Sequence, residues 1–221
     1  KVNRLADDEL AAECTQISSD LEAVGRLITD VKNLKIKRAE WALYRHPDGK
    51  TGRWELPELK GVTAYLDAGP DLKRALGGEG LETARELIAE AVRGIVQAET
   101  FFFAERGFAS AADYDAFWDN MYRNSCYYYS HLDEVEKTWM DYVGPIERPY
   151  NLFNRSKTAT VSRENGGAYR VTAVFIDSFH ELGIEFLVDG HGLIQSARGD
   201  YTSAPSRICW RNTGHLEKFT G

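Results

Sequence analysis

The segment that most constrains the fold runs from Ala111 to Val143 and is dense in aromatic side chains. Eight large residues in it are separated by three, four or seven positions, namely Tyr114, Phe117, Met121, Tyr128, Leu132, Val135, Trp139 and Tyr142. Such spacing is typical of one long helix with a buried face. The stretch from Phe101 to Phe153 holds 15 of the 26 aromatic residues. The helix is therefore expected to form a core or to wall a pocket for a planar ligand.

Residues 10–31 carry a second helical pattern. Their apolar positions alternate at steps of four and three: Leu10, Cys14, Ile17, Leu21, Val24, Ile28 and Val31. That spacing is typical of a coiled-coil seam. We expect a helix that begins at Asp7 or Asp8 and ends near Leu34, packed either within its own domain or against a second copy of the chain. In the second case the protein is a homo-oligomer.

A third helix is predicted from Glu82 to Arg106. It should lie antiparallel to the aromatic helix, because only Gly107 to Ser110 separate the two patterns. Earlier in the chain, Pro47-Asp48-Gly49 is a turn signal between residues 41–44 and 53–56, which predicts either a hairpin or an ordered loop there.

The pattern changes after Pro145 and Pro149, where apolar residues begin to alternate with polar ones. Four strands are predicted, with Asn165-Gly166 as a hairpin turn, at residues 158–163, 168–176, 181–188 and 193–199. A last helix from Ser203 to about Phe219 should cover the sheet. The predicted fold is α+β: an antiparallel helical part, then a four-stranded meander sheet with a covering helix. Residues 1–150 and 151–221 are the two parts, packed as one unit.

Charge and cysteine content limit the function classes. The net charge is −7, with 19 basic and 27 acidic residues up to Tyr150 and 8 basic and 7 acidic residues after it. No dense basic cluster is present, so a nucleic-acid partner is not expected. No run of about 18 apolar residues is present, so no membrane span is expected. Cys14, Cys126 and Cys209 are odd in number and far apart, which favours a reducing, cytoplasmic compartment.

The run Asp177-Ser178-Phe179-His180-Glu181 gathers two carboxylates, a hydroxyl and an imidazole between the second and third predicted strands. We expect His180 to act as a general base that Asp177 or Glu181 orients, or to be a metal ligand. The simpler alternative is a turn in which the Asp and Ser side chains bond the local backbone.

His131 is the second candidate catalytic residue, because Tyr127 lies one helical turn before it and Glu134 lies three positions after it. Substrate-binding groups would come from the aromatic helix and from the second predicted strand, namely Phe117, Tyr127, Tyr128 and Arg170. A packed histidine on a helix surface would explain the same spacing without function. No P-loop, GxGxxG, GxSxG or HExxH motif is present, so no cofactor is predicted.

Cys209 lies near the start of the last predicted helix, where a thiol is either a buried apolar group or an activated one. Four pieces of the C-terminal third together resemble a bacterial domain family of uncharacterised function: the Asp177–Glu181 run, Gly192-Leu-Ile-Gln-Ser-Ala197, the Pro205-x-x-x-Cys209 step and the closing Leu216-Glu-Lys-Phe-Thr-Gly221. The order of strands followed by a cysteine at a helix start is also similar to the iron–sulfur scaffold fold. That similarity implies a metal set of Cys209, His180 and Asp177, with two non-thiolate groups in place of thiolates.

Three functions agree with the sequence. The first is a cofactor-independent enzyme of the lyase, decarboxylase or hydrolase type, in which His180 moves a proton on a small planar or aromatic compound. The second is a metal- or iron–sulfur-handling accessory protein. The third is an interaction protein that oligomerises through the 10–31 helix without catalysis.

Overall fold

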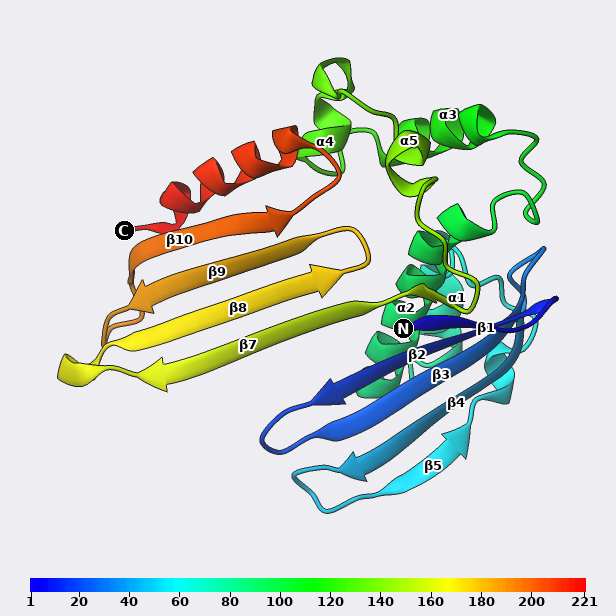
Figure 1. Cartoon of the computed structure of the whole chain (residues 1–221). Helices are drawn as coiled ribbons and strands as arrows, with labels where there is room; N and C mark the ends of the chain where they lie inside the picture. Colours follow the sequence, from blue (N-terminus) through cyan, green and yellow to red (C-terminus); the bar gives the residue numbers. More distant parts are fainter. The chain divides into compact units, whose positions relative to one another are not determined.

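The computed structural model describes all 221 residues (Figure 1). The chain forms two compact units. Unit 1 contains residues 1–110 and 147–154, and unit 2 contains residues 111–146 and 155–221. The chain therefore enters unit 2 after Ser110, returns to unit 1 at Glu147 and leaves it again after Asn154. No helix in either unit is both long enough and apolar enough to cross a membrane.

Unit 1 is built on a six-stranded antiparallel sheet. Its strands are β1 (Val2–Ala6), β2 (Glu9–Ile17), β3 (Glu22–Asp30), β4 (Ile36–Arg45), β5 (Gly52–Glu55) and β6 (Asn151–Phe153). The spatial order is β5-β4-β3-β2-β1-β6. The first five strands thus form a meander, and β6 returns from far along the chain to pair with β1.

The helix predicted over residues 10–31 is wrong, because this region forms most of β2 and β3. Its apolar positions also alternate at a period of two: Leu10 and Ala12 on β2 and Leu27 on β3 are all buried on one face of the sheet. The turn from Ser18 to Asp20 separates the strands, and the Ser18 hydroxyl donates to the Asp20 carboxylate at 2.8 Å. The prediction of a homo-oligomer contact rested on that helix and therefore has no support from the structure.

One long helix, α2 (Glu82–Ala98), covers a face of this sheet and confirms the start of the third predicted helix, although it ends before Arg106. It packs against β1, β2, β3 and β6. The approach is close at Gly25 of β3, where a Cβ would lie 2.9 Å from the Cβ of Leu87. Two shorter helices, η1 (Pro57–Leu59) and α1 (Gly69–Ala75), lie between β5 and α2 in the chain.

A buried carboxylate follows α2 in the short 3-10 helix η2 (Glu99–Phe101). Glu99 is fully buried, and it accepts a hydrogen bond from the Tyr65 hydroxyl at 2.6 Å and one from Nε of Arg106 at 2.8 Å. The Arg106 guanidinium also lies over the Tyr65 ring, 5.4 Å from its centroid. Because a buried carboxylate needs such partners, we interpret these contacts as structural support for unit 1.

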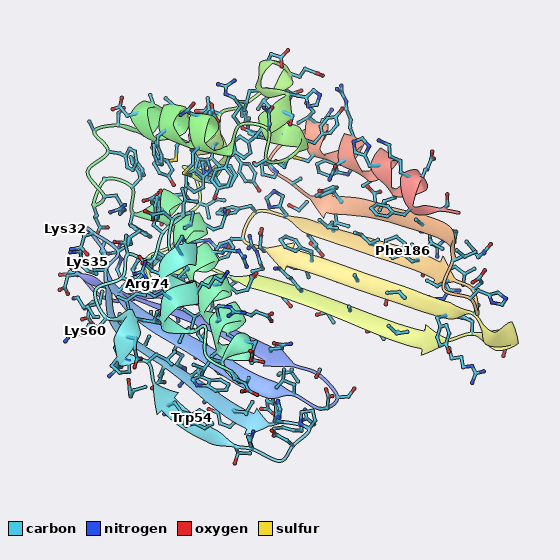
Figure 2. The ribbon with its side chains drawn as sticks, turned by 180° about the vertical axis from the view of Figure 1, so that it is seen from behind. Lys32, Lys35, Trp54, Lys60, Arg74 and Phe186 are labelled. Atoms are coloured by element: carbon cyan, nitrogen blue, oxygen red, sulfur yellow. The ribbon has the colours of Figure 1, made fainter.

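Of the two alternatives predicted around Pro47-Asp48-Gly49, a hairpin or an ordered loop, the structure has the hairpin. Strands β4 and β5 pair there, with Trp41 opposite Trp54. The two indole rings stack with centroids 4.8 Å apart, and Trp54 (Figure 2) keeps part of its surface exposed. This cross-strand aromatic pair stabilises the outer hairpin of the sheet.

Unit 2 contains a four-stranded antiparallel sheet, which confirms the four strands predicted in this region. The strands are β7 (Arg155–Arg163), β8 (Tyr169–Asp177), β9 (Glu181–Val188) and β10 (Ile194–Ser203), in the order β10-β9-β8-β7. The final helix η5 (Arg207–Phe219) is of the 3-10 type and lies along β10, as the red helix of Figure 1 shows. Phe186 of β9 (Figure 2) meets Phe219 of η5 edge to face, with ring centroids 6.2 Å apart.

The single aromatic helix predicted over residues 111–143 is wrong. This segment forms four short pieces, α3 (Ala111–Tyr122), α4 (Tyr127–Ser130), η3 (Leu132–Glu134) and α5 (Trp139–Val143). Asn124 adopts a left-handed conformation with φ of 63°, which ends the helical path after Tyr122. The helix predicted over residues 10–31 and the one predicted over residues 111–143 are both absent. The predicted fold class is therefore also wrong, since the N-terminal part is mostly strand rather than helix.

Candidate functional site

The candidate site is the turn between β8 and β9, which the Asp177 side chain organises. The backbone N–H of Asp177 donates to the carbonyl oxygen of His180 at 2.8 Å and closes the turn. In return, the backbone N–H groups of Phe179 and His180 both donate to Oδ1 of Asp177 at 2.9 Å. The turn therefore has the local side chain-to-backbone bonding that the sequence allowed as its simpler alternative.

The same carboxylate also contacts two side chains. Nδ1 of His180 lies 3.1 Å from Oδ1 of Asp177. On the other oxygen, Nη2 of Arg155 donates at 3.1 Å and Nε of Arg155 at 3.4 Å. The Asp177 side chain is 1% exposed, whereas the His180 side chain is 31% exposed. A buried carboxylate thus holds an accessible imidazole.

The electrostatics keep the Asp177 carboxylate ionised. Burial alone would raise its pKa, but the hydrogen bond and charge of His180, the backbone N–H of Phe179 and the Arg155 guanidinium together hold that pKa below its ordinary value. An ionised Asp177 can only accept hydrogen bonds, so Nδ1 of His180 carries the proton when the imidazole is neutral. The lone pair of the neutral ring is then on Nε2.

Helix α5 anchors this turn from the side. The buried Phe179 ring meets Trp139 edge to face with centroids 4.7 Å apart. The Tyr142 hydroxyl donates to the carbonyl oxygen of Phe179 at 3.2 Å. Burial, and next the charge of Asp177, raise the pKa of Tyr142, so its hydroxyl stays protonated and available as a donor. Both the side chain and the carbonyl group of Phe179 are therefore held by α5, and this fixes the adjacent backbone of His180.

Arg155 and Tyr142 are the residues of this site that sequence reasoning missed. The sequence does contain a signal for Arg155. In a hairpin centred on the Asn165-Gly166 turn, the residue that pairs with Asp177 is Arg155 or its direct neighbour. The structure pairs Arg155 with Asp177. No comparable signal exists for Tyr142, because its position depends on how α5 packs.

The remaining predicted catalytic residues are placed elsewhere. Glu181 begins β9 next to His180, and its backbone carbonyl accepts a hydrogen bond from the Thr202 hydroxyl at 3.3 Å. His180 is thus held by Asp177 and not by Glu181. His131 stacks on Tyr127 with ring centroids 4.2 Å apart, and its Nδ1 lies 2.9 Å from the Tyr127 carbonyl oxygen. No hydrogen bond, ion pair or ring contact joins His131 to His180.

The predicted substrate-binding residues do not gather around His180. Tyr128 lies in a small core with Ile208 and Cys209, and its hydroxyl donates to the Lys137 carbonyl oxygen at 3.2 Å. Phe117 lies on α3 and is 37% exposed. Arg170 lies near the start of β8, where it pairs with two carboxylates, those of Glu164 at 2.7 Å and Glu185 at 2.8 Å.

The metal set implied by the iron–sulfur resemblance does not fit this structure. Burial in the Tyr128 core raises the pKa of the Cys209 thiol, which keeps it protonated and a poor ligand. The Asp177 carboxylate is already occupied by Arg155, His180 and two backbone N–H groups. No group of three or more His, Cys, Asp or Glu side chains in the chain is arranged to hold a metal ion.

Comparison with protein-family models, with curated proteins and with solved structures found no match to this chain. The resemblance of the C-terminal third to a bacterial domain family therefore stays a prediction from its sequence. What the site can do chemically has to be argued from its own residues.

Proposed function

We propose that unit 2 is a small-molecule enzyme whose general base is His180, held by Asp177. One observation carries the proposal: an accessible imidazole is bonded through Nδ1 to a carboxylate that is buried, ionised and anchored by Arg155 and by backbone N–H groups. A histidine oriented by a buried carboxylate is an arrangement that general-base catalysis uses. Turn formation needs the Asp177 carboxylate, but it needs no imidazole bonded to that carboxylate.

The chemistry follows from the tautomer. Nε2 of neutral His180 takes a proton from a water molecule, a substrate hydroxyl or an activated C–H group, and the resulting imidazolium is stabilised by the Asp177 charge. Asp177 stays ionised during this transfer because Arg155 contacts its other oxygen. The proton then leaves Nε2 for the leaving group or the product. Lyase, decarboxylase and hydrolase reactions all use such a transfer.

A planar or aromatic substrate is part of the proposal. The Phe175 ring lies edge-on to the His180 imidazole with centroids 6.5 Å apart, and the Arg155 guanidinium lies over the same ring at 5.3 Å. An aromatic ring beside the base supports stacking of a planar group. The positive charge of Arg155 supports a substrate that bears a carboxylate or a polarised carbonyl.

The test uses p-nitrophenyl acetate, a planar aromatic ester whose hydrolysis reports an accessible and oriented imidazole. The full chain at neutral pH should hydrolyse it faster than free imidazole at the same concentration. Because a positioned general base contributes roughly a hundredfold or more in rate, His180→Ala should remove nearly all of that excess. Circular dichroism of the variant checks that the fold is kept.

His131→Ala is the matched control for this assay. His131 is also half-buried in unit 2, but its Nδ1 contacts a backbone carbonyl rather than a carboxylate. The variant should therefore keep the wild-type rate. A folded His180→Ala variant with the wild-type rate, or an equal loss in both variants, would contradict the assignment of His180 as the base.

The compartment is a separate part of the proposal. All three cysteines are free thiols, with Cys14 partly buried, Cys126 exposed and Cys209 buried. Free thiols persist in reducing compartments, which supports the cytoplasmic location expected from the sequence. Recovery of the chain from an oxidising compartment on cell fractionation would contradict it.

A further inference from the structure

We propose that the edge strand β7 of unit 2 docks an extended, acidic segment of a partner protein as a fifth strand of the sheet. β7 is an outer strand of the sheet. All nine of its residues pair with β8 in one unbroken register, from Arg155 opposite Asp177 to Arg163 opposite Tyr169. A long, regular edge is a ready template for a further strand.

The other outer strands lack this regularity. β10 shifts its register against β9 near both ends, and the N–H of Gly221 donates to the carbonyl oxygen of Ile194 at its start. In unit 1, β5 has four residues and β6 has three. β7 contains no proline, no glycine and no bulge. Of the features that protect edge strands from further pairing, it has only charged side chains.

The hydrogen-bond pattern identifies the backbone groups of β7 that face outward. At the hairpin turn, the N–H of Glu164 donates to the carbonyl oxygen of Ala168 at 2.8 Å. Bonded pairs alternate along an antiparallel ladder, so the even-numbered residues of β7 bond to β8 and the odd-numbered ones turn N–H and C=O outward. Ala159 and Val161 are therefore the central docking residues, and Val161 is 65% exposed.

The side chains of these odd-numbered residues share one face of the sheet. They place two apolar groups between cations: Arg155, Lys157, Ala159, Val161 and Arg163. Val171 and Ala173 of β8 stand opposite Val161 and Ala159 and widen the apolar strip. η5 packs along β10 at the opposite edge of the sheet, on the same face as this strip, because Phe186, which meets Phe219 of η5, stands opposite Val171.

Charge selects the occupant. β7 carries three cations and no carboxylate, and one of the three, Arg155, is paired with Asp177 of β8. A second copy of β7, paired antiparallel about Ala159, would place Arg155 opposite Arg163, and like charges directly opposite are destabilising. An acidic strand instead places carboxylates opposite Lys157 and Arg163 and apolar groups opposite Ala159 and Val161. The complementary pattern on the partner is acid-x-apolar-x-apolar-x-acid, because alternate residues share a face.

The test is a titration of the full, 15N-labelled chain with the peptide ETVTVTE, followed by NMR. The shift changes should concentrate in β7, and amide hydrogen exchange should slow at Ala159 and Val161. The peptide KTVTVTK should bind about tenfold more weakly, because two favourable cross-strand charge pairs become unfavourable ones. Raising the salt concentration should reduce the difference between the peptides.

Two variants separate backbone pairing from charge. Ala159→Pro removes one outward N–H without removing a bond to β8, so it should abolish binding of ETVTVTE while the sheet is kept. The double variant K157E/R163E keeps every N–H and should prefer KTVTVTK. Several results would overturn the proposal: equal binding of both peptides, no binding of ETVTVTE at millimolar concentration, or new protection confined to even-numbered amides. A concentration-dependent dimer that Ala159→Pro dissociates would show that a second copy, not an acidic partner, takes this edge.

Discussion

Replacement of Asp177 by Asn tests the site through its stability. Asn keeps an oxygen for the N–H groups of Phe179 and His180, but it loses the charge that faces Arg155 and His180. Hydrogen bonds to charged groups stabilise by roughly 1.5–3 kcal/mol each. The Arg155 and His180 side chains are partly exposed, and water therefore screens their attraction to Asp177. We expect a loss of about 2 kcal/mol in the unfolding free energy of unit 2.

The assay is urea unfolding at pH 7 and pH 3, followed through NMR signals of β8 and β9. The pKa of Asp177 is lower in the folded state than its unfolded value of about 3.9. Its contribution is therefore fully present well above that value and is lost as pH falls through the folded pKa. The difference between wild type and Asp177→Asn should be full at pH 7 and should shrink below about pH 4.

Asp189→Asn is the matched control for that comparison. Asp189 also accepts turn N–H groups, from His191 and Leu193, but it is only half-buried and has no arginine partner. Its replacement should destabilise the protein less than Asp177→Asn does. Two results would refute the role of the Asp177 charge. One is an unfolding free-energy difference for Asp177→Asn that stays constant between pH 7 and pH 3. The other is a difference no larger than that of Asp189→Asn.

Three further predictions concern packing, a buried ion pair and thiol reactivity. Gly25→Ala should lower the unfolding free energy of unit 1 by about 1–3 kcal/mol in thermal unfolding, because the new Cβ meets α2; unchanged stability would contradict this. Glu99→Gln should destabilise unit 1 by about 3 kcal/mol in urea, since it leaves the Arg106 charge without its buried partner. Iodoacetamide at pH 8 should modify the exposed Cys126 before the buried Cys209, as mass spectrometry of timed samples would show.

The sheet of unit 2 could be predicted because local signals agree there. Residues from Arg155 onward alternate at a period of two, and Asn165-Gly166 marks the first turn. Asp177 and His180 could be predicted as a pair because only two residues, Ser178 and Phe179, separate them within one turn. Arg155 is 22 positions from Asp177, so its role depends on strand register, and register follows only when the turn is placed correctly.

The fold of unit 1 could not be predicted in the same way. The β2 and β3 segment has apolar residues at steps of three and four and, through Ala12, Ala23 and Leu27, also at a period of two, so the spacing alone does not separate helix from strand. The deciding signal is the short Ser18-Ser19-Asp20 turn, together with pairing to distant strands that the local sequence does not report. In unit 2, the aromatic residues of 111–143 keep helical spacing throughout, but the left-handed conformation of Asn124 ends the helix there.

The central claim is that Asp177 holds His180 with its basic nitrogen available. Long-range 1H–15N NMR of the imidazole ring measures this directly, at a pH where the ring is neutral. The bond from Nδ1 to Asp177 predicts a proton on Nδ1 and an unprotonated Nε2, and Asp177→Asn should shift this tautomer balance. A neutral His180 that carries its proton on Nε2 in the wild-type chain would contradict the account.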